Sequence, residues 1–466
     1  MRRIPLLCGV LFLGLAVTLI SRDPQTDPRL KKASRAAERA GWIQVHLEGS
    51  PAEIGFQHGY LLAPEIRDTF ETVKAETVHD EKKDWDFFRK VAQDVYWPHV
   101  EQEYRDELNG IVEGLAARDV KLDRWDVVAL NAWLELGYYD KWWDKANGRT
   151  PTNPAVPDHC SAFAATGSYT KDGHVVIGHN NWTTYATGER WNIMFDIVPA
   201  RGNRILMDGM AGLIHSGDDF GLNSAGIIIT ETTISEFDSF EPNAVPEFVR
   251  ARKAMQYANS IDDFARIMRE GNNGGYANNW LVADRKNDEV ASLELGLKHT
   301  PLLRTRDGFF VGSNYANDPE LMKDETKFDP NDKGKSENAR HARWLTLMDQ
   351  YKGKIDVAAG EKFLSDHVDS TTGKTSPSER TLCGHVELSP RGMPTWQGPY
   401  APVGAVQNKI TDGAGAARMS MVAALGHSCG LNFKAGDHLS KHPEYAWTRP
   451  ILKDMNARGW AKFTAK

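Results

Sequence analysis

The sequence is poor in cysteine, has no excess of positive charge and contains no apolar run of full transmembrane length. Four cysteines among 466 residues cannot build the disulfide framework of a small secreted domain, and a chain of this length can bury a large core without one. Lys and Arg number 56 against 63 Asp and Glu, so the net charge is -7. We therefore expect no nucleic-acid partner, because phosphate contacts need a concentrated basic face.

Short motifs for metals and phosphates are also missing. The chain has no H-E-x-x-H and no C-x-x-C pair, and nothing in the sequence places His58, His215 and His385 together. No Gly-rich loop stands between a strand and a helix, as a phosphate-binding loop requires. The sequence therefore predicts no metal site and no cofactor. It also has no internal repeat and no low-complexity segment.

The N-terminus has the pattern of an export signal. Arg2 and Arg3 precede an apolar run over residues 6–20, and polar sequence begins at Ser21. The run is short for a membrane span, which needs about 20 residues. Because no clear A-x-A site follows it, residues 1–21 are predicted to be either a signal peptide or an uncleaved membrane anchor. Either way the chain is expected to be exported, with a linker over residues 22–41.

Periodicity divides the remaining chain into a helical part and a β-rich part. After a short strand at 42–46, residues 60–139 are expected to be mostly helical. Three prolines within residues 147–158 predict an exposed loop. Helices followed by strands and further helices predict an α+β fold with two sheets covered by helices. Strands are expected over 161–170, 175–178, 191–198, 204–206, 226–233, 279–283 and 290–295, and helices over 245–271, 337–351, 358–366 and 419–425.

Cys160 begins the β-rich part, directly after the Pro-rich loop. Taken alone, a single cysteine at a strand start is typical of a small buried hydrophobe. A series of short motifs follows it, however, and each is rich in groups that can donate or accept hydrogen bonds. These motifs are His179-Asn180-Asn181-Trp182, Asp218-Asp219-Phe220, Ser224-Ala225-Gly226, Glu231-Thr232-Thr233 and Tyr276-Ala277-Asn278-Asn279-Trp280.

In this order and at these spacings, the motifs resemble those of the phospholipase B-like proteins. More broadly, they resemble the Cys-type N-terminal-nucleophile (Ntn) hydrolases, which include bile-salt hydrolase and the penicillin acyltransferase of the peptidase C45 type. Residues 49–59 and 400–412 resemble the acyltransferase branch in particular. The resemblance covers roughly residues 42–430. It implies a four-layer αββα sandwich, in which 42–159 form an N-terminal helical segment and 160–466 form the catalytic portion.

The resemblance also implies a self-cleaving chemistry. The bond between His159 and Cys160 would break, which would leave Cys160 with both a thiol and a free α-amine. The segment before the cut is either retained with the catalytic portion or released. The expected activity is hydrolysis, or acyl transfer, of a linear amide or acyl ester of a small molecule or lipid, through a thioester on Cys160. A phospholipase B-like lipid deacylase and a non-catalytic binding protein of the same fold are the alternatives.

Further roles are carried over from the family by position. His179 and Trp182 fall beside the nucleophile. In the bile-salt hydrolase branch an Asp at the position of Trp182 holds the α-amine, so the group that holds the amine here stays open. Asn278 matches the oxyanion-binding Asn, and Asn279 is one residue away. Arg340 is the candidate for the family's distal Arg, with Arg343 as its substitute and a solvated helix face as the alternative.

Three further patterns have competing interpretations. Residues 426–430 match G-x-S-x-G around Ser428, but a nucleophile elbow needs a preceding strand, and residues 419–425 are expected to be helical. Cys383 and Cys429 could form a disulfide, and two buried free thiols are an equal alternative. The sequon at Asn181 is not expected to carry a glycan if it lines the pocket.

Overall fold

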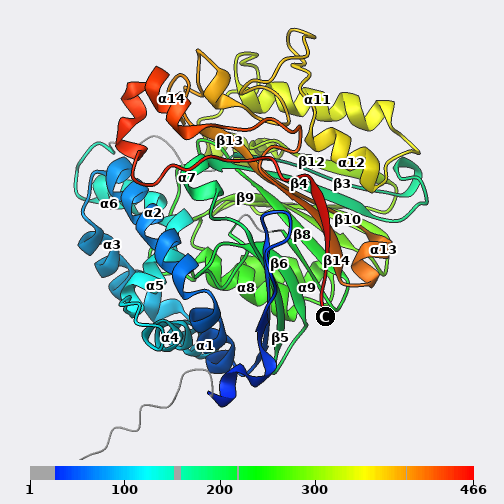
Figure 1. Cartoon of the computed structure of the whole chain (residues 1–466). Coiled ribbons are helices and arrows are strands. Elements are labelled where there is room, and N and C mark those ends of the chain that lie inside the picture. Colours follow the sequence, from blue (N-terminus) through cyan, green and yellow to red (C-terminus); the bar gives the residue numbers. More distant parts are fainter. Residues whose placement is uncertain (1–26, 152–158, 218–219, 395) are drawn as a thin grey trace, which may run out of the picture.

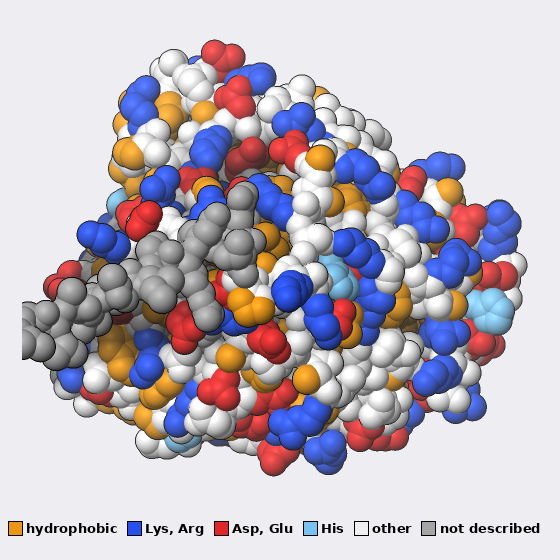
Figure 2. Space-filling view, turned by 60° about the horizontal axis from the view of Figure 1, so that its bottom comes forward, with side chains coloured by type: hydrophobic (Ala, Val, Ile, Leu, Met, Phe, Trp, Pro, Cys, Tyr) orange, Lys and Arg blue, Asp and Glu red, His pale blue; other side chains and the backbone are white. Residues whose placement is uncertain are grey.

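The computed structural model describes residues 27–151, 159–217, 220–394 and 396–466. The predicted signal or anchor therefore lies outside the described residues, as do Asp218 and Asp219. Within the described ranges, no helix combines the length and apolar character needed to cross a membrane. On the face in Figure 2, positive and negative side chains are interspersed.

Two β-sheets form the centre of the molecule (Figure 1). The larger sheet has nine strands in the order β1-β2-β5-β6-β7-β8-β9-β10-β11, and the smaller has six in the order β12-β3-β4-β13-β14-β15. The strands of the larger sheet are β1 (Ser34–Arg35), β2 (Ile43–Gly49), β5 (Ile193–Pro199), β6 (Ile205–Gly209), β7 (Gly221–Asn223), β8 (Ile227–Thr233), β9 (Asn278–Asp284), β10 (Glu289–Leu295) and β11 (Leu302–Thr305). Those of the smaller sheet are β3 (His159–Thr166), β4 (Val176–Thr184), β12 (Gly308–Gly312), β13 (Val403–Asp412), β14 (Ser420–Leu425) and β15 (Trp460–Thr464).

Helices cover the outer face of each sheet. The N-terminal helices, with α8 and α9, pack on the larger sheet, whereas α11 and α12 pack on the smaller one (Figure 1). The helices of the layer on the larger sheet are α1 (Pro51–Leu61), α2 (Ala63–Glu81), α3 (Trp85–Val91), α4 (Gln102–Ala116), α5 (Arg124–Asn131), α6 (Trp133–Ala146), α8 (Glu247–Tyr257) and α9 (Ile261–Arg269). Among them α1, α8 and α9 contact the strands, whereas α3 and α4 pack mainly on other helices. The remaining helices are α7 (Tyr185–Gly188), α10 (Pro319–Glu325), α11 (Ser336–Gln350), α12 (Val357–Leu364), α13 (Gly413–Ala417) and α14 (Ala435–Lys441).

Strand alternation explains the layers. In β9, Leu281 and Ala283 belong to the core between the two sheets, while Trp280 and Val282 point to the helices. Because successive side chains of a strand point to opposite faces, a strand with two apolar faces is covered on both sides. The predicted four-layer αββα arrangement is confirmed.

Close packing of α1 on α4 explains the glycines near residue 55. A Cβ on Gly55 would lie 1.9 Å from the carbonyl oxygen of Glu107, and one on Gly59 would lie 2.1 Å from that of Ile111. Only glycine lets the two backbones approach this closely. The pattern that resembled an acyltransferase motif therefore has a packing role here.

The structure corrects three details of the secondary-structure prediction. Part of the expected linker is ordered, as a 3₁₀ turn at Pro28–Lys32 and as β1. The helix expected over 245–271 is two helices, α8 and α9. The helix expected over 419–425 is wrong: this segment is β14, paired with β13 and β15, and pairing inside a sheet overrides helix propensity. A strand thus precedes Ser428, but no helix follows directly, and the Ser428 hydroxyl donates to the Leu364 carbonyl at 2.9 Å.

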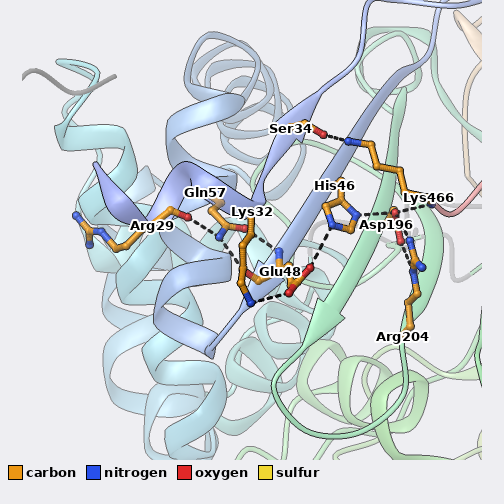
Figure 3. Close-up of polar contacts among 9 residues, drawn as sticks. All are labelled: Arg29, Lys32, Ser34, His46, Glu48, Gln57, Asp196, Arg204 and Lys466. Carbon is orange, nitrogen blue, oxygen red and sulfur yellow. Dashed lines mark hydrogen bonds and ion pairs between the residues drawn. The ribbon is translucent and has the colours of Figure 1, made fainter. Parts of the chain in front are cut away.

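Asp196 joins the N-terminal strands to the last residue of the chain (Figure 3). Its buried carboxylate, on β5, accepts hydrogen bonds from His46 Nδ1 at 2.7 Å, from Arg204 Nε at 2.7 Å and from the Lys466 backbone N–H at 3.0 Å. The Lys466 ammonium also donates to Ser34 of β1. Burial alone would raise the pKa of Asp196, but the bonds from Arg204, Lys466 and His46 outweigh it and hold the pKa below its ordinary value.

We expect Asp196→Asn to lower the free energy of unfolding by about 1–3 kcal/mol near neutral pH, because it removes charge-assisted hydrogen bonds. A lowered folded-state pKa stabilises the fold above the ordinary carboxyl pKa of about 3.9, and this contribution disappears as the pH falls through the folded-state value. The difference in unfolding free energy between wild type and variant should therefore become smaller at acidic pH. Urea unfolding at several pH values measures it.

Lys32→Ala is the matched control, because it removes a more exposed ion pair of the same network, with Glu48 at 2.7 Å. It should lower the unfolding free energy much less than Asp196→Asn does, because exposed ion pairs are screened by solvent. Equal losses in the two variants would contradict the role assigned to Asp196.

Candidate active site

Cys160 lies near the start of β3, and its side chain is 1% exposed. Cys160 is opposite Asn181 in the antiparallel pair with β4. It has the strand parity of Ala162 and Ala164, which line the core between the sheets. The thiol Sγ lies 3.8 Å from the Asn181 side-chain oxygen. The thiol therefore faces the inter-sheet space rather than the outer helices.

Both backbone polar groups of Cys160 are bound by side chains. Its N–H donates to Asn314 Oδ1 at 2.8 Å, and its carbonyl accepts from Arg340 Nη1 at 2.5 Å. Asn314 follows β12 with a φ of 71°, a left-handed conformation that Asn tolerates better than most residues. These two bonds fix the backbone on either side of the Cys160 Cα.

Arg340 is fully buried on α11 and reaches neutral oxygens. Besides the Cys160 carbonyl, it donates to Ser161 Oγ, Asn314 Oδ1 and Ser336 Oγ, each at 3.0 Å. Burial lowers the pKa of Arg340 to about 10, so the guanidinium stays charged at neutral pH. The alternative of a solvated helix face is thus excluded.

Arg343, the substitute for Arg340, does not take part in the contacts around Cys160. Its guanidinium pairs with Asp366 at 2.7 Å.

His179 and Glu231 lie next to the Cys160 thiol. Sγ, one His179 ring nitrogen and one Glu231 carboxylate oxygen are all within 4.8 Å of one another. Burial, and then the positive charge of Lys409, hold the pKa of His179 well below its ordinary value, so the ring is neutral. Lys409 is opposite His179 in the β4–β13 pair and lies 3.4 Å from the Asp208 carboxylate. These atom types could also hold a metal ion as a set of three.

Trp182 lies on the opposite face of β4 from His179. Its indole N–H donates to the Leu382 carbonyl at 3.2 Å, and its ring lies 4.5 Å from the Arg340 guanidinium carbon. The Asn180 amide also donates to the Leu382 carbonyl, at 2.7 Å. Trp182 therefore supports Arg340 and the loop at Leu382 instead of contacting the thiol.

Asn278 and Asn279 point to opposite faces of β9. Asn279 has the parity of Leu281 and Ala283, which face the sheet that carries Cys160. Its side-chain oxygen accepts from Ser292 at 2.7 Å, while its Nδ2 is buried without a hydrogen-bond partner among the described residues. Neither amide atom of Asn278 has such a partner in the described chain.

A pocket of about 170 Å³ opens between α2, α6 and the end of β4. Its lining includes Glu76, Trp133, Thr184 and Trp396. Burial raises the pKa of Glu76 to about 7. A second pocket of about 90 Å³ shares Glu76 and Thr184 with the first. It continues along apolar side chains that include Val403, Trp447 and Leu452.

Sequence reasoning gave no role to Asn314, Asn181 or Glu231. Asn181 and Glu231 stand inside the motifs quoted above, so those motifs could have suggested them. Asn314 carries no local signal, because its bond to Cys160 joins residues 154 positions apart.

Comparison with known proteins gives the chain a family. A sequence model described as Phospholipase B matches residues 54–367. Among curated proteins, an uncharacterized protein of Archaeoglobus fulgidus is 27% identical over 266 residues, 53% of this chain and 42% of that protein. Phospholipase B-like protein C of Dictyostelium discoideum is 27% identical over 41% of this chain and 37% of its own. Phospholipase B-like 1 of Bos taurus is 25% identical over 50% of this chain and 48% of its own.

The chain thus spans less than half the length of these curated relatives. Among solved structures, penicillin V acylase from Agrobacterium tumefaciens is 10% identical with a TM-score of 0.31, over 57% of this chain and 82% of that one. A variant of conjugated bile acid hydrolase from Clostridium perfringens is 12% identical with a TM-score of 0.32, over 57% and 89%. Because the family's sequence model matches more than half of the chain, the protein belongs to the phospholipase B family.

Proposed function

We propose that the chain is an exported, self-processing hydrolase of the Ntn type whose nucleophile is Cys160. The observation that carries the proposal is the setting of this residue. Its thiol lies beside His179 and Glu231, and separate side chains bind its N–H and its carbonyl. A structural cysteine would also need partners for its buried N–H and carbonyl, but it would not need an imidazole and a carboxylate beside its thiol. Export rests on the sequence of residues 1–21.

Maturation would begin with attack of the Cys160 thiol on the carbonyl carbon of His159. A C–S bond forms, the His159–Cys160 C–N bond breaks, and the thiol proton ends on the Cys160 nitrogen. Water then hydrolyses the resulting thioester, which gives a His159 carboxylate and regenerates the thiol. Asn314 supports this step, because its side-chain oxygen already accepts the N–H of the nitrogen that becomes the amine.

The free α-amine would then serve as the general base. Its reference pKa of about 7.7–8.0 suits neutral pH. Arg340 contacts the same Asn314 oxygen that binds the Cys160 nitrogen, so its positive charge disfavours protonation of the amine. Asn314 thereby takes the amine-holding place that Trp182 cannot fill.

Of the two candidates, Asn279 is proposed as the oxyanion donor. It faces the sheet of Cys160, and the bond from Ser292 to its oxygen orients the amide so that Nδ2 remains free to donate. An amide N–H aimed at the developing negative charge is what acyl transfer requires. Asn278 lies on the other face of β9, which it shares with Trp280 and Glu231, and no described residue orients its amide by a hydrogen bond.

The substrate is proposed to be an acyl amide or acyl ester. Cys160 lines neither pocket, but both pockets include Thr184, at the end of the strand that carries His179. The apolar side chains of the second pocket offer a surface for an acyl chain, and the first pocket carries Glu76 and other polar groups. An apolar surface next to a polar one also suits a lipid. Together with the family membership, this favours the lipid deacylase as a second candidate.

After cleavage the two fragments are proposed to stay together. β2 precedes the cut but lies inside the larger sheet, between β1 and β5. Its seven residues pair with β5 in parallel, and the Asp196 network of Figure 3 bonds β2 to the C-terminal residue. Separation would break this sheet and expose its core.

Cys160→Ala is expected to abolish turnover, because no other described thiol lies beside His179. The assay follows fatty-acid release from an N-acyl amide and, in parallel, from a lysophospholipid. Ser428→Ala is the matched control and should keep wild-type turnover. Activity lost with Ser428→Ala and kept with Cys160→Ala would contradict the proposal. An inert wild type that still binds acyl compounds would favour a binding protein.

Asn279→Ala is expected to lower kcat by about 100-fold or more, the effect of removing one oxyanion donor. Asn278→Ala, the adjacent control, should leave kcat within a few-fold of wild type. Steady-state kinetics on a soluble acyl reporter measures both. A large loss of kcat in the Asn278 variant alone would reverse the assignment.

A further inference from the structure

Four metal-ligating side chains meet behind Trp182, three from the segment between α12 and β13 and one from the loop after β14. They are His367, which follows α12, Cys383 and His385 in the loop before β13, and Cys429 after β14. One ligand atom from each lies within 4.8 Å of each of the others. Neither Cys383 nor Cys429 forms a disulfide. No step of the proposed reaction uses this cluster.

The spacing of the ligand atoms matches a tetrahedral site. His385 Nε2 lies 3.5 Å from Cys383 Sγ and 3.5 Å from Cys429 Sγ. Zinc–nitrogen bonds of about 2.0–2.1 Å and zinc–sulfur bonds of about 2.3 Å at a tetrahedral angle place nitrogen and sulfur roughly 3.5 Å apart. The fourth side chain, His367, has its Nε2 buried without a hydrogen-bond partner among the described residues.

The Glu387 carboxylate orients His385, the candidate ligand that contacts both sulfurs. Glu387 Oε1 lies 2.9 Å from His385 Nδ1, so this ring nitrogen donates to the carboxylate and Nε2 is left facing the two sulfurs. Glu387 is held in turn by the Tyr185 hydroxyl. A carboxylate behind a histidine ligand is the usual outer-shell arrangement of protein zinc sites.

We propose that His367, Cys383, His385 and Cys429 bind one zinc ion. Two thiolates and two neutral imidazoles are a standard structural zinc set, and their charges balance Zn²⁺. On binding, the two thiols would release their protons to solvent as two Zn–S bonds form, and no oxidant is needed. A disulfide between Cys383 and Cys429 is the competing state, and it would leave both imidazoles without a role.

Zinc here would fix the loop that supports the active site. Cys383 stands between Leu382, whose carbonyl accepts from Trp182 and Asn180, and Gly384. A Cβ on Gly384 would lie 2.1 Å from the Trp182 ring, so this loop lies directly against the indole. The ion would therefore be structural. This inference stands whether or not Cys160 is the nucleophile.

The test is the zinc content of the full chain, purified without a polyhistidine tag or chelator and measured by mass spectrometry of the metal. We expect about one zinc per chain, because the four-ligand set provides one closed site. Cys383→Ser and Cys429→Ser should each reduce this content at least tenfold. Cys160→Ser, which removes a thiol outside the cluster, should keep it.

A second measurement covers variants that fail to fold. Wild-type protein stripped with chelator is titrated with Co²⁺, and the site should produce sulfur-to-cobalt charge-transfer and tetrahedral d–d absorption at one equivalent. Glu387→Gln should weaken Co²⁺ binding about tenfold or more. Metal-free protein with a Cys383–Cys429 disulfide in its peptide map, or zinc content unchanged by both cysteine substitutions, would overturn the proposal.

Discussion

The buried guanidinium of Arg340 holds the candidate active site together. It crosses from α11 to the start of β3 and binds the Cys160 carbonyl, the Ser161 hydroxyl and the Asn314 amide oxygen. A buried charge is tolerated only when its hydrogen-bonding capacity is used, so the positions of these oxygens and of α11 depend on one another. The same Asn314 oxygen also accepts a hydrogen bond from the Cys160 N–H, so Arg340 fixes the position of that N–H through Asn314. The proposed nucleophile is thus positioned through its backbone.

The two faces of β4 carry side chains with different contacts. His179 and Asn181 point between the sheets toward the thiol, whereas Asn180 and Trp182 point outward and bind the loop at Leu382. A single four-residue motif therefore contains groups that act beside the thiol and groups that support the structure behind it. The Cys/His cluster joins the outer face, which explains why an ion there would support the site without contacting substrate.

Hydrophobic periodicity and turn residues predict much of the fold. They predict only part of the candidate site. The β9–β10 hairpin and α11 have strong local patterns and were predicted close to their observed bounds. β14 was predicted wrongly as a helix, because its strand conformation depends on pairing with β13 and β15 and not on its local sequence. Cys160 and His179 were selected as candidates from the order of the motifs, and Arg340 from the resemblance to the family. Asn314 and the four-residue Cys/His cluster could not be, because chain folding alone brings their distant segments together.

The intact mass of the purified chain tests the central claim most directly, with wild type beside Cys160→Ala. The account predicts two wild-type fragments that meet at His159 and Cys160 and co-elute until denatured, and a single uncut chain in the variant. A wild-type chain that stays uncut at neutral and acidic pH, or a variant cut at the same bond, would contradict the assignment of Cys160 as a self-processing nucleophile.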